Sequence, residues 1–187
     1  MKIEHLAIWV DNLETMRTFY LKYFDTTSNR TKNNGKTIKV AFIVVQSNNP
    51  LRKKDPLLYT AGGPGGSSLG WARGASQHSL INDRDCIAFE QRGTMYSVPN
   101  LWSPELSDAI KESYRENLNK DSMVIVGVKR YKKALEAKGI DLSGYNTDET
   151  VADIDDQLTT LNIDSVNLWG GSYSGGLMLA VLQKDSS

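Results

Sequence analysis

The sequence has 187 residues, about the length of one domain or of one domain with a short appendage. Its 22 Lys and Arg balance 22 Asp and Glu, which argues against a nucleic-acid-binding protein because that class usually carries a basic excess. No apolar run approaches the roughly 20 residues of a membrane span, and the N-terminus lacks the apolar region and cleavage site of a signal peptide.

The first quarter of the chain predicts a strand, a helix, a linker and a second strand. Ile3–Val10 predicts the first strand, and Asp11 with Glu14 is typical of a capping box at the start of a helix. Apolar residues then recur at helical spacing: Leu13, Met16, Tyr20 and Tyr23. The polar segment Thr26–Lys36 predicts a linker, and Thr37–Gln46, rich in β-branched residues, predicts the second strand.

Short strands and longer helices alternate over the rest of the chain. The expected strands are Leu57–Thr60, Asp85–Phe89 and Ser165–Trp169. The expected helices are Pro104–Asn117, Met123–Lys138, Asp148–Leu161 and Gly175–Gln183. Gly139 is expected to end the second of these helices, whose shared apolar face is Val124, Val128, Tyr131 and Leu135. This alternation indicates an α/β fold with a mostly parallel sheet covered by helices on both faces.

The sharpest chemical signal is the turn Gly170–Gly176, between a predicted strand and a predicted helix. A G-x-S-x-G turn in this context is a nucleophile elbow, in which the serine takes a positive φ and the residues two positions away must be small. Gly170 meets this requirement, and Ser174 replaces the usual glycine with another small residue. The pattern predicts an outward-facing Ser172 hydroxyl beside a helix N-terminus, and the alternative is an ordinary glycine-rich turn.

A second glycine-rich loop, Ala61–Ser68, follows a short predicted strand. It is not a phosphate-binding P-loop, because no Gly-Lys-Ser/Thr follows, and no G-x-G-x-x-G register fits a dinucleotide site. Glycine permits close approach of the backbone, so the loop is suited to present N–H groups to a developing oxyanion. The alternative is a tight turn without a chemical role.

These segments resemble the α/β-hydrolase fold, in particular serine peptidases of the proline-iminopeptidase and tripeptidyl-aminopeptidase type. The resemblance is carried, in order, by PLLYTAGGPGGSSLGWA (56–72), DRDCIAFEQRGTMYSVPNL (83–101), GIDLSGYNTDETVADIDDQLTTLNI (139–163) and VNLWGGSYSGGLMLAVL (166–182). It implies that Ser172 is the nucleophile, that the N–H groups of Tyr173 and Gly63 form the oxyanion hole, and that Arg92 braces the loops. The implied substrate is a peptide or a small ester or amide, with no cofactor.

Residues 1–28 resemble a different family: they are similar to the opening strand and helix of a glyoxalase/bleomycin-resistance module. We therefore expect a short leader over residues 1–30, and the N-terminal part of a hydrolase domain over residues 31–187. In the glyoxalase family a histidine near the position of His5 often binds a metal. One histidine cannot hold a catalytic metal, so no metal is expected, and a metal-dependent lyase or resistance module is the less favoured alternative.

An α/β hydrolase supplies its catalytic triad in the chain order Ser, Asp or Glu, His. Here both histidines, His5 and His78, precede Ser172, so the chain resembles the N-terminal half of a hydrolase, whether truncated, fused or split. We expect such a chain to be inactive or incomplete alone, and a non-catalytic remnant is the alternative. An unfinished sheet would leave an exposed edge, which favours self-association or pairing with a C-terminal half.

Other conspicuous residues are expected to be structural or solvated. Cys86 is expected to be a buried thiol. Because it is the single cysteine, no internal disulfide can form, which favours a cytoplasmic location. Solvated or structural positions are expected for Asp153, Asp155 and Asp156, and a solvated face for Lys129, Arg130, Lys132 and Lys133. Core packing is expected for Trp71, Trp102 and Trp169.

Overall fold

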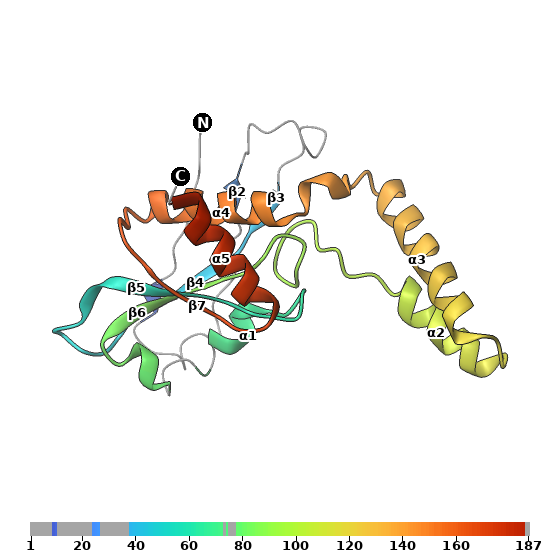
Figure 1. Ribbon diagram of the computed structural model, residues 1–187, viewed down its shortest axis with the longest axis horizontal. Helices are drawn as coiled ribbons and strands as arrows, with labels where there is room; N and C mark the ends of the chain where they lie inside the picture. The colour runs from blue at the N-terminus through green and yellow to red at the C-terminus, as the bar shows by residue number, and fades with distance from the viewer. Residues whose placement is uncertain (1–8, 11–23, 27–37, 73, 75–77, 186–187) are drawn as a thin grey trace.

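A five-stranded sheet forms the centre of the computed structural model, which describes residues 9–10, 24–26, 38–72, 74 and 78–185. In spatial order the strands are β1 (Trp9–Val10), β4 (Phe42–Val45), β6 (Arg84–Phe89), β5 (Lys53–Thr60) and β7 (Asn167–Gly170). Only the β4–β6 pair is antiparallel, so the sheet is mostly parallel, as predicted. The crossing from β6 back to β7 places β7 beside β5 at one edge of the described sheet (Figure 1).

The strand predicted over Thr37–Gln46 is present, but it divides at Ala41 into two strands that join different sheets. Its first part, β3 (Ile38–Val40), pairs antiparallel with β2 (Phe24–Thr26). Its second part, β4, joins the main sheet. The Ala41 carbonyl still accepts a hydrogen bond from the N–H of Glu90 (2.9 Å), so the division leaves no unpaired buried carbonyl there.

Five helices occupy the described part of the chain; the last four agree closely with the four predicted segments, and the first was not predicted. They are α1 (Ser68–Ala72), α2 (Glu105–Arg115), α3 (Lys120–Ala137), α4 (Thr147–Thr160) and α5 (Tyr173–Asp185), with 3-10 turns η3 (Ser79–Ile81) and η4 (Leu142–Gly144). Asn119 and Asn146 cap α3 and α4, because each side chain accepts a hydrogen bond from the backbone N–H three residues later. Gly139, with φ +66°, ends α3 as predicted.

Two apolar clusters lie on opposite faces of the sheet. On one face α4 and α5 bury Ile154 and Val181 against strand residues that include Leu58 and Ile87. On the other face α1 buries Leu69 and Ala72 against a cluster that includes Cys86 and Ala88. Figure 1 shows this division, with α4 and α5 on one side of the sheet and α1 on the other. The expectation of helices on both faces is therefore confirmed.

Helices α2 and α3 form an antiparallel hairpin that projects away from the sheet (Figure 1). The apolar face predicted for α3 is confirmed in part: Leu135 is buried and Val124 and Tyr131 are half-buried, whereas Val128 is 49% exposed. Met123 and Gly127, which were not in the predicted face, are buried. The reason is that α3 packs on α2 rather than on the sheet. A Cβ on Gly127 would lie 2.9 Å from Cβ of Ala109, so this glycine allows the close approach of the two helices.

The described residues do not test every sequence prediction. The helix predicted from Asp11 lies outside them, as do most of the first predicted strand and of the predicted linker. Where the structure describes the first 30 residues, β1 and β2 pair with strands of the following segment. Among the helices of the described segments, none is both long and apolar enough to cross a membrane.

Candidate active site

Ser172 occupies the sharp turn between β7 and α5. Its φ is +57°, a left-handed conformation that serine rarely adopts, and the residue is exposed. A Cβ on Gly170 would lie 2.7 Å from the Ser174 carbonyl oxygen, so only glycine fits at this position. Ser174 is fully buried, and its Oγ accepts from the N–H of Gly171 (3.0 Å) and donates to the Gly171 carbonyl (2.9 Å). The serine at 174 thus closes the turn that holds Ser172.

The loop that follows β5 lies directly against this turn. A Cβ on Gly62 would lie 2.7 Å from the Gly171 carbonyl oxygen and 3.1 Å from Cβ of Ser172. Gly63 and Gly65 have φ values of +119° and +92°, and the N–H of Gly66 donates to the Gly62 carbonyl (3.1 Å). The loop is therefore a tight turn whose glycines allow it to contact the segment that carries Ser172.

Two of the backbone N–H groups in the glycine loop and the turn at Ser172 form no hydrogen bond with an acceptor in the described part of the chain. They belong to Gly63, in the loop, and to Tyr173, the first residue of α5. The first N–H groups of a helix have no partner within the helix, and they carry its positive potential. These are the two groups that the sequence singled out as oxyanion donors.

His78 is the one histidine within the described residues, and it forms no hydrogen bond with Ser172 there. It caps η3, where its Nδ1 accepts from the N–H of Leu80 (3.4 Å). Its ring lies 5.2 Å from the Trp169 ring, measured between centroids. The other histidine, His5, lies outside the described residues. Within the described residues, therefore, no histidine lies in hydrogen-bond contact with Ser172 as a general base.

Trp169 belongs to a half-buried aromatic cluster on the α1 face of the sheet. The Tyr59 ring is centred 4.4 Å from the Trp71 ring and 4.7 Å from the Trp169 ring. The packing expected for Trp71 and Trp169 is thus present at the edge of the core. Trp102 is 75% exposed, so the same expectation is wrong for it, because the segment before α2 runs away from the sheet.

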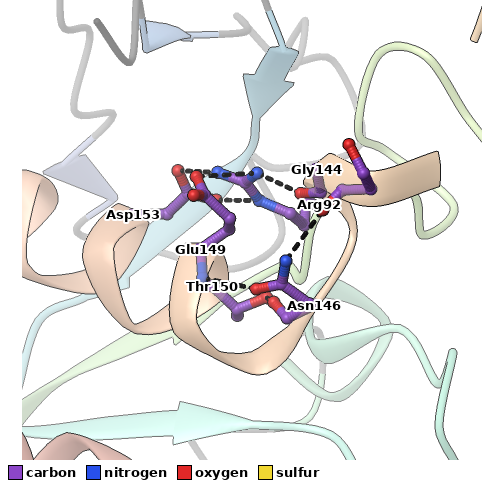
Figure 2. A network of polar contacts seen from close by, with 7 residues as sticks. Arg92, Gly144, Asn146, Glu149, Thr150 and Asp153 are labelled. Carbon is purple, nitrogen blue, oxygen red and sulfur yellow. Dashed lines mark hydrogen bonds and ion pairs between the residues drawn. The ribbon is translucent and has the colours of Figure 1, made fainter. Parts of the chain in front are cut away.

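A buried ion-pair network connects the turn after β6 to α4 (Figure 2). The Arg92 guanidinium donates from Nε to Asp153 Oδ2 (2.8 Å) and from Nη2 to Asp153 Oδ1 (2.6 Å). Its Nη1 donates to the carbonyl of Gly144 and lies 3.5 Å from Glu149 Oε2. All three charged side chains are at least nine-tenths buried, so the network is shielded from solvent. Arg92 braces η4 and α4, and the structure shows no contact between it and Ser172.

The bracing role expected for Arg92 is present, but its partners were not predictable from the resemblance. Asp153 is structural, one of the two roles expected for it, while Asp155 is exposed and pairs with Lys184 (2.6 Å). Burial raises the pKa of Asp153, and the Arg92 guanidinium opposes that rise. Glu149 was missed. Its position four residues before Asp153, on the same face of a helix, is the signal that identifies it as a second partner.

Cys86 is fully buried in β6, as expected, and burial raises the pKa of its thiol to about 12. The thiol is therefore protonated at neutral pH and unsuited to act as a nucleophile. Across the described segments, no three His, Cys, Asp or Glu side chains are grouped so that they could hold a metal ion. The basic residues at 129, 130, 132 and 133 are exposed, as expected, and Arg130 pairs with Glu112 (2.7 Å).

Comparison with models of known protein families gives a match. The model of a family described as alpha/beta hydrolase fold matches residues 55–187, well over half of the chain. The match begins within β5 and includes the glycine loop, the Arg92 network and the turn at Ser172. It does not extend to residues 1–28, so the resemblance of that segment to a glyoxalase module gains no support. No curated protein matches the sequence.

Proposed function

We propose that this chain, which belongs to the α/β-hydrolase fold family, is a serine hydrolase that forms an acyl-enzyme at Ser172. The observation that carries the proposal is the positive φ of an exposed serine between a strand and a helix. A strained serine at this position presents its hydroxyl at the carboxyl end of the sheet, where substrates of open α/β folds bind.

The proposed reaction uses three groups of this chain. The Ser172 Oγ attacks the carbonyl carbon of the substrate, and its proton passes to a general base. The negative charge that forms on the carbonyl oxygen is bound by the N–H groups of Gly63 and Tyr173, both of which lack a protein acceptor in the described segments. The base then protonates the leaving amine or alcohol, and water hydrolyses the acyl-enzyme to release the acid and restore Ser172.

The proposed substrates are peptides with a free N-terminus, together with small esters and amides. This part of the proposal rests on the resemblance of the glycine loop, the Glu90–Gly93 turn and the turn at Ser172 to proline iminopeptidases and tripeptidyl aminopeptidases. A cytoplasmic enzyme is proposed because a chain with one cysteine needs no oxidising compartment.

A second candidate function is a hydrolase fold without catalytic activity. The observation that favours it is the position of His78, which caps η3 and does not contact Ser172. Without a base, the serine hydroxyl is a weak nucleophile at neutral pH. The two candidates share a fold and differ in the reactivity of one hydroxyl group.

Labelling with a fluorophosphonate probe separates the two candidates. Labelling of the folded wild-type chain, with Ser172→Ala unlabelled and circular dichroism showing that both are folded, supports the enzyme and requires a base supplied by His78, His5 or a partner chain. Ser174→Ala is not a suitable control, because the Ser174 side chain closes the turn. Ser143→Ala, at an exposed position in η4, is the matched serine variant that should label as the wild type does. A folded wild-type chain that takes no label contradicts the enzyme and supports the non-catalytic candidate.

A further inference from the structure

Glu90 is a fully buried carboxylate. Hydrogen bonds, rather than ion pairs, compensate for the water that it loses on burial. It follows β6 directly and forms no ion pair within the described residues. Its Oε2 accepts from Ser68 N (2.9 Å), Leu69 N (3.2 Å) and Ser67 Oγ (3.2 Å). Burial of a carboxylate is costly unless its oxygens are hydrogen-bonded, and here three donors on one oxygen come from one short segment.

That segment is the end of the glycine loop. Residues 67–69 lead from the loop into α1, so Glu90 fixes the point at which the loop ends. The fourth partner of the carboxylate, the Thr94 hydroxyl, lies outside the loop. Its oxygen is 3.0 Å from Oε1 of Glu90 and 2.6 Å from the Gln91 carbonyl oxygen, so its one proton is shared between the two acceptors.

Gln91, the next residue, fixes the point at which the loop begins. Its Nε2 donates to Thr60 Oγ1 and to the Ala61 carbonyl, both at 2.9 Å. The N–H of Ala61 donates to Ser68 Oγ (2.8 Å), which joins the two ends of the loop. Gly63 lies between these anchors, and Gly62 contacts the turn at Ser172.

We propose that Glu90 and Gln91 are positioning residues that hold the loop of residues 61–68, and with it the N–H of Gly63, beside Ser172. The inference rests on the proposed function for the role of that N–H, but the anchoring itself does not depend on a reactive serine. An oxyanion donor acts only when its N–H is fixed at the position that the oxygen will occupy. Two adjacent side chains after β6 supply that fixation through the two ends of one loop.

The experiment compares Glu90→Leu with Glu90→Gln. Leucine fills the site but leaves three donors without an acceptor, whereas glutamine retains one oxygen that can accept from all three. Thr94→Val is the matched control, because it removes the partner of the carboxylate outside the loop, while the Gln91 carbonyl, which the Thr94 hydroxyl also contacts, keeps the Ser97 hydroxyl as a donor (2.7 Å). Hydrogen–deuterium exchange is measured on the peptide of residues 61–69, with the α4 peptide as an internal reference, and labelling rates are measured with the fluorophosphonate.

We expect Glu90→Leu to raise the exchange rate of the loop by about tenfold or more without raising that of α4, and to lower the labelling rate by about tenfold or more. Glu90→Gln and Thr94→Val should resemble the wild type in both measurements. Unchanged loop exchange in Glu90→Leu, or an equal rise in α4, overturns the inference. Faster loop exchange with unchanged labelling overturns it as well. If neither the wild type nor any variant takes the label, the proposed function fails. In that case a selective rise of loop exchange in Glu90→Leu still supports the anchoring of the loop by Glu90.

Discussion

Gly170 and Gly171 are adjacent in the turn before Ser172, but a side chain would meet different surroundings at each. A Cβ on Gly170 would lie 2.7 Å from a backbone oxygen, whereas a Cβ on Gly171 would meet no atom within 4 Å. We expect Gly170→Ala to lower the free energy of unfolding by about 1–3 kcal/mol, because the turn must shift to admit the methyl group. Gly171→Ala should change it by about 0.5 kcal/mol or less. Urea denaturation measures both, and equal effects would contradict the proposed geometry of the turn.

At the scale of elements, the Arg92 network holds α4 and η4 to the turn after β6. Arg92→Met removes the guanidinium that pairs with the buried carboxylate of Asp153 and contacts that of Glu149, which should cost about 3–5 kcal/mol of unfolding free energy. The exposed pair between Lys184 and Asp155 is the matched control, and Lys184→Met should cost about 1 kcal/mol or less. The midpoints of chemical denaturation compare the two variants.

A second variant separates the loss of a charge pair from the loss of packing. Adding Asp153→Leu to Arg92→Met removes one of the carboxylates that lose the guanidinium, so the double variant should recover part of the lost stability. If the double variant is less stable than Arg92→Met, the cost arises from packing around α4 and the ion pair is not its source.

The sequence predicted elements and local motifs better than it predicted their contacts. The turn at Ser172 was predictable because its strand, small residues and helix are contiguous in the chain. The partners of Arg92 were not, because Gly144, Glu149 and Asp153 lie 52 to 61 residues further along the chain. The buried face of α3 was predicted only in part, because periodicity indicates an apolar face without showing whether a sheet or another helix covers it.

At the scale of the whole molecule, β7 leaves one edge of the described sheet unpaired. β7 pairs with β5 on one side, and none of Asn167–Gly170 is a charged residue or a proline, the residues that commonly block such edges. We propose that copies of the chain associate through this edge, and we expect the weight-average mass in sedimentation velocity to rise with concentration. A synthetic peptide of residues 165–170 should reduce the association, and its N-methylated analogue should not. A monomer at every concentration would contradict the proposal.

The aromatic cluster gives the protein an intrinsic optical reporter. Trp169 lies three residues before Ser172, and its ring centroid is 5.1 Å from that of Trp71, in the helix that follows the glycine loop. Indole rings this close couple their electronic transitions, so their circular dichroism depends on the mutual orientation of the two rings. The spectrum of the unmodified chain will therefore register any separation of the glycine loop from the turn that carries Ser172, without an attached dye.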